Sequence, residues 1–226
     1  MCGRYALTVS GRVLAEALGL EVVPEVAPRY NIAPTQQVGI VRADREGGRK
    51  WASAHWGLIP SWAKDAGIGA RMINARGETI TEKPAFRSAA KRRRCLIPAD
   101  LFYEWKREET GKQPFAIRLT DGRPFAMAGL WERWPGAGAE PVESCTIITT
   151  AANGTVAPLH DRMPVILPPT AFAEWLSGTE LPQERLAALL VPYPESEMET
   201  FPVCKRVNSP ANDDPECLRP APAERA

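Results

Sequence analysis

The chain has 226 residues, of which 28 are Lys or Arg and 27 are Asp or Glu, so its formal net charge is only +1. Its length and even composition predict one compact domain with a sizeable core. The weak overall charge neither indicates nor excludes a nucleic-acid partner, because such a partner would have to be bound by a local basic patch. Five cysteines without CxxC spacing and only two histidines predict neither a disulfide framework nor a zinc site, and we expect no metal and no cofactor.

The first strong helical pattern covers 11–20, and two more cover 169–176 and 182–191. Short apolar or alternating segments bounded by Gly or Pro predict strands at 38–41, 51–56, 115–119, 125–131, 145–150 and 164–167. We therefore predict an α+β fold with a mixed, largely antiparallel sheet and a few flanking helices. Residues 209–226 are rich in Pro, Ala and charge, and we expect them to form a loosely ordered C-terminal tail after a domain at 1–208.

No leader pattern and no apolar stretch of ~18 residues occurs in the sequence, which predicts no membrane association and a cytoplasmic protein, bound to the nucleoid when it holds DNA. No long apolar stripe is left over for an interface, so we expect a monomer.

Cys2 becomes the amino-terminal residue once the initiator methionine is removed, which a small second residue permits. A 1,2-aminothiol would then be available. Its amine condenses with an aldehyde, and its thiolate closes a thiazolidine ring on the resulting imine. Reference pKa values of about 7.7 to 8.0 for the amine and about 8.5 for the thiol put both groups near neutrality. The alternative is that Cys2 is only a small buried residue.

Four polar residues lie in apolar, turn-rich surroundings: Asn31, Asn74, Glu104 and His160. A carboxyl group between Tyr103 and Trp105 is expected to be desolvated, which raises its pKa and suits it to act as a general acid. His160 can shuttle protons near neutral pH, and Asn74 can orient a ligand. A solvent-exposed Glu104, a structural His160 and a turn-capping Asn74 are the alternatives.

Basic residues and tryptophans give a further indication of function. The stretch 87–94 contains five Lys or Arg residues, and other arginines lie within or beside the polar motifs. Together they could line a phosphate-binding groove. Trp56 and Trp62 flank a Gly/Pro-containing loop, where a ring could stack on or wedge between bases. The alternative is that the tryptophans belong to the core and the charge run is a solvated face.

Seven ordered motifs resemble the SRAP family, the SOS-response-associated peptidase domain, and the related domain of the vertebrate hydroxymethylcytosine-binding, ES-cell-specific protein. They are Met-Cys-Gly-Arg-Tyr from Met1, Arg-Tyr-Asn-Ile-Ala-Pro-Thr from Arg29, Trp-Gly-Leu-Ile-Pro-Ser-Trp from Trp56, Ile-Asn-Ala-Arg-Gly-Glu-Thr from Ile73, Arg-Cys-Leu-Ile-Pro-Ala-Asp from Arg94, Phe-Tyr-Glu-Trp from Phe102 and His-Asp-Arg-Met-Pro from His160. The resemblance extends from Cys2 to about Pro215 and implies a barrel-like sheet core.

The resemblance implies an abasic-site sensor that crosslinks through Cys2 to single-stranded DNA and shields the lesion as a thiazolidine. Glu104 would assist sugar opening, Asn74 would hold the deoxyribose, and His160 would shuttle protons. DNA contacts are implied for Arg4, Asn31, Trp62, Arg76 and Arg162, with a single-strand/double-strand junction as one candidate substrate.

Three points qualify the implied chemistry. With Met1 attached, the Cys2 nitrogen is an amide and cannot form an imine. The family commonly has Gly directly before Phe-Tyr-Glu-Trp, whereas this chain has Leu101, which predicts a different turn before Glu104. Two other functions stay open: a peptidase with Cys2 as nucleophile, acting on Met1 or on other proteins, and a reader that binds single-stranded or modified DNA non-covalently.

Overall fold

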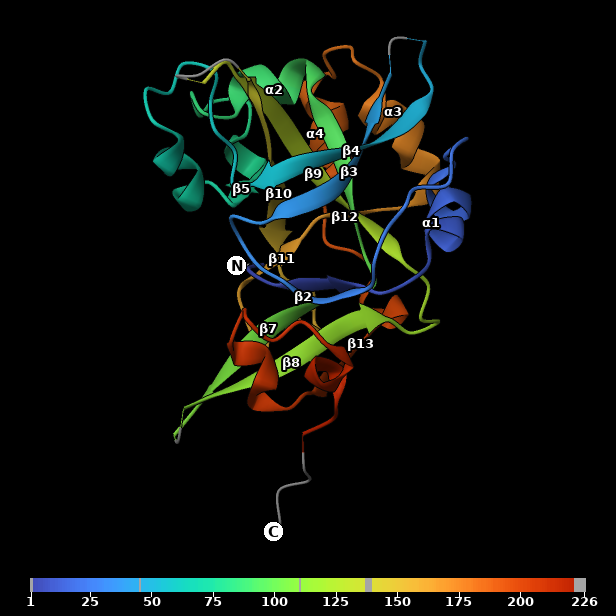
Figure 1. Cartoon of the computed structure of the whole chain (residues 1–226), viewed down its shortest axis with the longest axis vertical. Coiled ribbons are helices and arrows are strands. Elements are labelled where there is room, and N and C mark those ends of the chain that lie inside the picture. The colour runs from blue at the N-terminus through green and yellow to red at the C-terminus, as the bar shows by residue number, and fades with distance from the viewer. Residues whose placement is uncertain (1, 45, 110, 137–139, 222–226) are drawn as a thin grey trace.

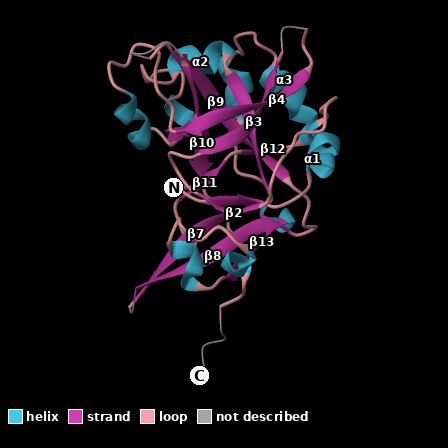
Figure 2. Ribbon diagram, in the orientation of Figure 1, coloured by secondary structure: helices cyan, strands magenta, loops and turns pink. Residues whose placement is uncertain are grey.

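The computed structural model describes residues 2–44, 46–109, 111–136 and 140–221. Two β-sheets lie one above the other in Figure 1, with most helices around the upper one. Figure 2 shows that strands form the interior and that helices lie at the periphery. The fold is α+β, as the sequence predicts.

Five strands of the larger sheet close into a barrel. The ring runs β10 (Val142–Ala151), β4 (Arg49–Trp56), β3 (Gln37–Ala43), β6 (Arg94–Ala99), β9 (Phe125–Trp134) and back to β10. All neighbours in the ring are antiparallel except β10 and β4, which are parallel. Closure removes the exposed strand edges that an open sheet would leave.

Three short strands extend the barrel sheet. β5 (Asn74–Arg76) pairs with β10 in parallel, β11 (Arg162–Pro164) pairs with β10 antiparallel, and β12 (Ile166–Leu167) pairs with β9. Because β10 residue Thr149 is opposite both Arg76 and Pro164, β5 and β11 lie on opposite edges of β10. This arrangement brings two distant segments of the chain to the same end of the barrel.

The smaller sheet is antiparallel and has the order β13, β8, β7, β1, β2. Its strands are β1 (Tyr5–Leu7), β2 (Arg29–Ile32), β7 (Leu101–Glu108), β8 (Gly111–Leu119) and β13 (Met198–Pro202). In Figure 1, β2 lies between the barrel above and β7 and β8 below. Leu101, which the sequence predicts to change a turn, is the first residue of β7 and lies opposite Ala6 and Arg118; the chain bends at Asp100, directly before it.

The helices are short. They are α1 (Gly11–Leu18), α2 (Arg87–Arg92), α3 (Phe172–Leu176) and α4 (Gln183–Leu189). The described residues also contain six 3-10 helices: η1 (Ala66–Arg71), η2 (Gly77–Thr79), η3 (Pro169–Ala171), η4 (Glu195–Glu197), η5 (Lys205–Asn208) and η6 (Pro215–Leu218). α1 begins after Ser10, whose hydroxyl accepts from the Val13 amide, and ends at left-handed Gly19. Within the described residues, no helix is long and apolar enough to cross a membrane.

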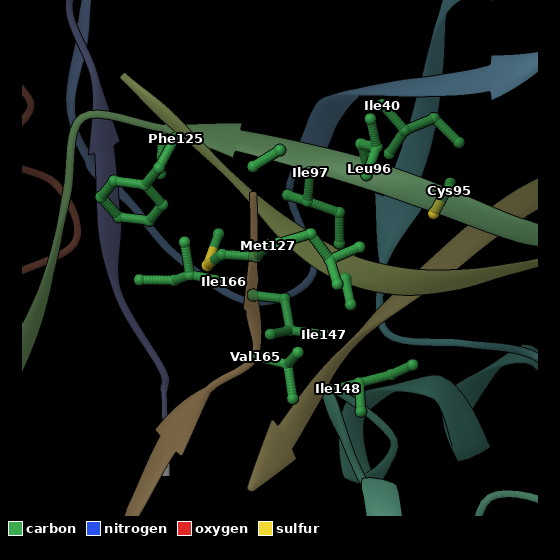
Figure 3. Packing of buried hydrophobic residues seen from close by; sticks show 14 of the residues in the cluster. Ile40, Cys95, Leu96, Ile97, Phe125, Met127, Ile147, Ile148, Val165 and Ile166 are labelled. Carbon is green, nitrogen blue, oxygen red and sulfur yellow. The ribbon is translucent and has the colours of Figure 1, made fainter. Parts of the chain in front are cut away.

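The main core fills the barrel and the space around it. Figure 3 shows Ile40, Leu96, Met127 and Ile147 gathered from four strands of the ring. Each such side chain stabilises the fold by roughly 1.5–3 kcal/mol on burial. β1 contributes to two clusters because its side chains alternate: Tyr5 packs in the main core, whereas Ala6 packs in a second cluster with Tyr103 and Ala116.

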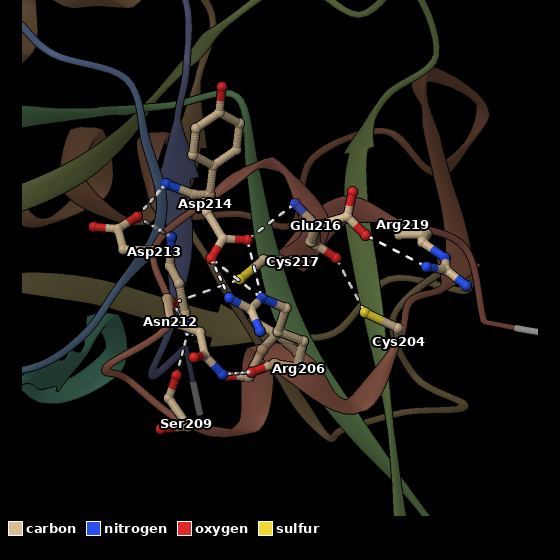
Figure 4. A network of polar contacts seen from close by, with 12 residues as sticks. Cys204, Arg206, Ser209, Asn212, Asp213, Asp214, Glu216, Cys217 and Arg219 are labelled. Carbon is tan, nitrogen blue, oxygen red and sulfur yellow. Dashed lines mark hydrogen bonds and ion pairs between the residues drawn. The ribbon is translucent and has the colours of Figure 1, made fainter.

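Residues 209–221 differ from the loosely ordered tail that their composition predicts. Asn212, Asp213 and Asp214 take part in a polar network (Figure 4), and Cys217 is fully buried. Val203 forms a β-bridge with Pro220, so the segment is tied to the end of β13. Polar bonds, together with the packing of Cys217 and Leu218 in the second cluster, fix a segment that is poor in large apolar residues. Residues 222–226 of the expected tail lie outside the described residues.

Candidate functional site

Cys2 is fully buried three residues before the start of β1 and belongs to the main core cluster. Its carbonyl oxygen accepts a hydrogen bond of 2.8 Å from the Asn74 side-chain amide. β5 holds Asn74 in place because its pairing with β10 puts this residue opposite Ile147. Burial, and then the nearby charge of Glu104, raise the pKa of the Cys2 thiol far above its usual value. The thiol is therefore protonated at neutral pH in this structure.

Glu104 lies on β7 opposite Phe115 and is only 4 % exposed. Burial raises the pKa of its carboxyl group, and the neighbouring His160 opposes that rise. The expectation of a desolvated carboxyl group is thus confirmed, and the exposed-Glu alternative is wrong. The electrostatic influence of Glu104 on Cys2 and of His160 on Glu104 puts these three residues in one neighbourhood.

His160 is half-buried and has two contacts at Nδ1. The Arg162 amide nitrogen lies 2.9 Å away, and Asp161 Oδ1 lies 2.7 Å away. One nitrogen cannot accept and donate at once. A neutral ring accepts from the Arg162 amide, whereas a ring protonated at Nδ1 donates to Asp161. The imidazole therefore has a hydrogen-bond partner in either protonation state.

Asn74 also connects Cys2 to an open groove. The groove has a volume of about 480 Å³, and its lining includes Trp62, Asn74, Arg76, Lys83 and Phe86. The Asn74 Oδ1 atom is buried and has no hydrogen-bond partner among the described residues. Because Asn74 Nδ2 donates to the Cys2 carbonyl, the unpaired Oδ1 acceptor lies close to Cys2.

Trp62 is 59 % exposed and separates this groove from a second hollow of about 750 Å³. Lys64 and Arg71 line the second hollow. An exposed ring of this size between two basic hollows has room to stack on a base. Trp56, in contrast, is fully buried against Tyr5 and belongs to the core.

The three arginines predicted at the DNA interface have different environments. Arg76 is exposed in the groove. Arg4 donates to Asn31 Oδ1 at 2.8 Å and to the Val207 carbonyl at 2.7 Å, and burial lowers its pKa. Arg162 forms a bidentate ion pair with Glu78, at 2.6 and 2.8 Å. Of the three, only Arg76 is exposed and forms no hydrogen bond or close ion pair within the described residues, although its positive charge helps to lower the pKa of Glu78.

Asn31 is fully buried, so direct contact of its side chain with DNA is incompatible with this structure. Its amide instead lies 3.1, 2.9 and 2.7 Å from the carbonyl oxygens of Val207, Ser209 and Asn212. Asp213 accepts from the amides of Tyr30 and Asn31. Asn31 therefore links the C-terminal segment to β2, and its side-chain oxygen accepts a hydrogen bond from Arg4.

The basic run at 87–94 does not line the groove described above. Arg94 is buried and donates to the carbonyls of Ala90, Trp175 and Thr179. Lys83, Phe86 and Glu78 were not predicted as site residues. Only Glu78 has a sequence signal, since it belongs to the same motif as Asn74.

Comparisons with known proteins agree with this architecture. The family model for SOS response associated peptidase (SRAP) matches residues 1–210. "Abasic site processing protein YoaM" of Bacillus subtilis is 44 % identical over 222 residues, covering 96 % of this chain and 97 % of the relative. "Abasic site processing protein HMCES" of Gallus gallus is 32 % identical over 264 residues, covering 97 % of this chain and 78 % of the relative.

A solved structure from Bacteroides thetaiotaomicron superposes with a TM-score of 0.87 at 26 % identity, covering 97 % of this chain and 100 % of that one. The chain thus shares its fold with this solved structure. With its family model matched over residues 1–210, the chain belongs to the SRAP family.

Proposed function

We propose that this protein processes abasic sites by forming a covalent crosslink between Cys2 and the abasic sugar in single-stranded DNA, once Met1 is removed. The observation that carries the proposal is the placement of Cys2 beside buried Glu104 and at Asn74, where an open groove begins. The relatives named as abasic site processing proteins support the substrate.

An abasic site is a masked aldehyde, and both reactive groups of Cys2 are needed to trap it. The free α-amine adds to C1 of the open sugar, and loss of one water gives an imine. The thiol sulfur then bonds to the imine carbon while its proton passes to the nitrogen, which closes a thiazolidine. Because the imine is consumed, β-elimination no longer breaks the strand. A slow capture would leave time for lyase-type cleavage.

The surrounding side chains have matched tasks in this proposal. Glu104, with its raised pKa, donates a proton to the ring oxygen as the sugar opens and to the departing water. His160 transfers protons from its half-buried position. The unpaired Oδ1 of Asn74 accepts from a sugar hydroxyl. The protonated Cys2 thiol favours attack by the amine first and by sulfur second.

The groove supplies the DNA interface. Trp62 stacks on a base, and Arg76 and Lys83 face phosphates, which suits an unpaired strand because stacking tolerates any base. Trp62 is also the ring that would separate the two strands at a junction between single-strand and double-strand DNA. The name of the matched family supports a second role for Cys2 in removing Met1 by autoproteolysis.

A denaturing gel tests the proposal. Met1-free protein, verified by intact mass, is mixed with a single-stranded oligonucleotide that carries one abasic site, beside Cys2→Ala and an oligonucleotide with intact bases. We expect a shifted band that needs both Cys2 and the abasic site, with a mass equal to the two partners minus water. Absence of the band would contradict crosslinking. Binding without a band would favour the non-covalent reader, and Cys2-dependent peptide cleavage would favour the peptidase.

A further inference from the structure

Two segments on opposite edges of β10 approach Cys2. β5 and η2 form the first, which includes Asn74 and Glu78, and the stretch from His160 through β11 is the second. Glu78 and Arg162 join the two segments although 84 residues separate them in the sequence. The ion pair therefore spans the end of β10 and ties together the elements that position Asn74 and His160.

The geometry of this pair is fixed at several points. Arg162 Nη1 lies 2.6 Å from Glu78 Oε1, and Nη2 lies 2.8 Å from Oε2. Nη2 also lies 2.7 Å from the Thr149 carbonyl oxygen of β10. The Arg162 side chain is only 16 % exposed, and its hydrogen bond lowers the pKa of Glu78. A bidentate pair of this kind restricts the guanidinium more than a single contact does.

The main chain of Arg162 in turn holds the histidine. Its amide lies 2.9 Å from His160 Nδ1, and this bond sets the imidazole plane in the neutral state. We propose that Glu78 is a positioning residue that acts through Arg162 to orient His160 for the crosslinking reaction. This inference rests on the proposed function. It assigns Arg162 an internal task.

The test separates the rate of crosslinking from the affinity for DNA. For Met1-free wild type, Glu78→Ala and Glu78→Gln, we would measure the first-order rate of adduct formation at saturating abasic DNA and the Kd for an intact oligonucleotide. Misplacing a reacting group by about 1 Å reduces rates up to about 100-fold. We expect Glu78→Ala to slow crosslinking about tenfold, with a Kd within about twofold of wild type. The crosslinking rate of Glu78→Gln should lie between those of wild type and Glu78→Ala.

Glu174→Ala is the matched control, since Glu174 forms an exposed bidentate pair with Arg185, both contacts being 2.8 Å, and neither residue lines the groove. We expect no change in its rate. Thermal unfolding of every variant verifies that each is folded. A wild type that forms no adduct defeats the proposed function itself, whereas an active wild type with an equally fast Glu78→Ala overturns only this inference.

A double-mutant cycle with His160→Ala distinguishes positioning from general damage. If Glu78 acts through the imidazole, Glu78→Ala slows the His160→Ala protein by less than twofold. If the rate of the double variant falls by the product of the two single-variant effects, the inference is overturned. A loss of DNA affinity equal to the loss of rate would overturn it as well.

Discussion

At the scale of single residues, burial determines which cysteine reacts. Cys2, Cys95, Cys145 and Cys217 are buried, whereas Cys204 is partly exposed. The raised pKa of the Cys2 thiol leaves little thiolate at neutral pH, and the thiolate is the form that reacts.

We therefore expect iodoacetamide to alkylate Cys204 of the native, Met1-bearing protein faster than Cys2, and unfolding to raise the rate at Cys2. Peptide mass spectrometry of a time course at pH 7.5, with a guanidinium-unfolded sample as reference, measures the order. Native Cys2 labelled as fast as Cys204 would contradict the burial described here.

Glu104 provides a pH-dependent prediction. Because its pKa is raised by burial, the folded state binds more protons than the unfolded state between the ordinary pKa and the raised one. Stability contributed by this group is thus lost as the pH rises through that window. We expect Glu104→Gln to gain stability relative to wild type on going from pH 4 to pH 7, while its crosslinking slows. Thermal unfolding at both pH values measures this. A difference in Tm between the variant and wild type that is the same at both pH values would contradict a raised pKa of Glu104.

Arg76 separates DNA binding from support of the fold. Its exposed guanidinium lines the groove, so Arg76→Ala should weaken binding to an intact single strand and reduce the slope of log K against log salt by about 0.7. Arg118→Ala is the control, because Arg118 pairs with Glu199 on the smaller sheet. Fluorescence anisotropy between 50 and 300 mM salt checks both. An equal loss in the two variants would indicate a non-specific charge effect.

At the scale of elements, the side-chain amide of Asn31 makes several of the contacts that hold the C-terminal segment. Asn31→Ala removes its bonds to Val207, Ser209 and Asn212 together with an acceptor for Arg4. The loss of this many hydrogen bonds lowers the free energy of unfolding by roughly 2–4 kcal/mol. The Tm should fall by roughly 5–15 °C.

Calorimetry of Asn31→Ala beside Asn212→Ala, which loses one exposed side-chain bond, checks this. Amide exchange should also rise at 207–213. A Tm near that of wild type would mean that η5 and η6 are fixed by other contacts.

The elements also show what the sequence could and could not predict. The strands β3, β9 and β10 were predicted within a few residues, because each contains a run of mostly apolar residues. β6 was missed because Arg94 and Pro98 interrupt its apolar residues, and β7 because its outer half is charged. Motifs identified Cys2, Asn74 and Glu104, but no local pattern could show that Asn31 and Arg4 bind the chain's other end.

At the scale of the whole molecule, the barrel and the smaller sheet share elements. β6 and β7 are separated only by Asp100, whose Oδ2 accepts from the hydroxyl of Thr8 at 2.6 Å. β1 packs on both hydrophobic clusters.

We therefore expect one cooperative unfolding transition. Circular dichroism at 222 nm and tryptophan fluorescence, recorded over the same urea series, should give coincident curves. Two separated midpoints would mean that the smaller sheet unfolds on its own.

The bonds from Arg4 to Val207 and Asn208 span 203 and 204 residues, so the start of the chain is closed onto almost its last-made part. During translation at about 5–20 residues per second, that closure is impossible for roughly 10–45 s. For all of this time the nascent amino-terminal segment lacks these bonds, and they form only after the ribosome has released residues 207 and 208. Removal of Met1 by an external enzyme can thus precede the fixing of Arg4, because the two ends of the chain are synthesised in this order.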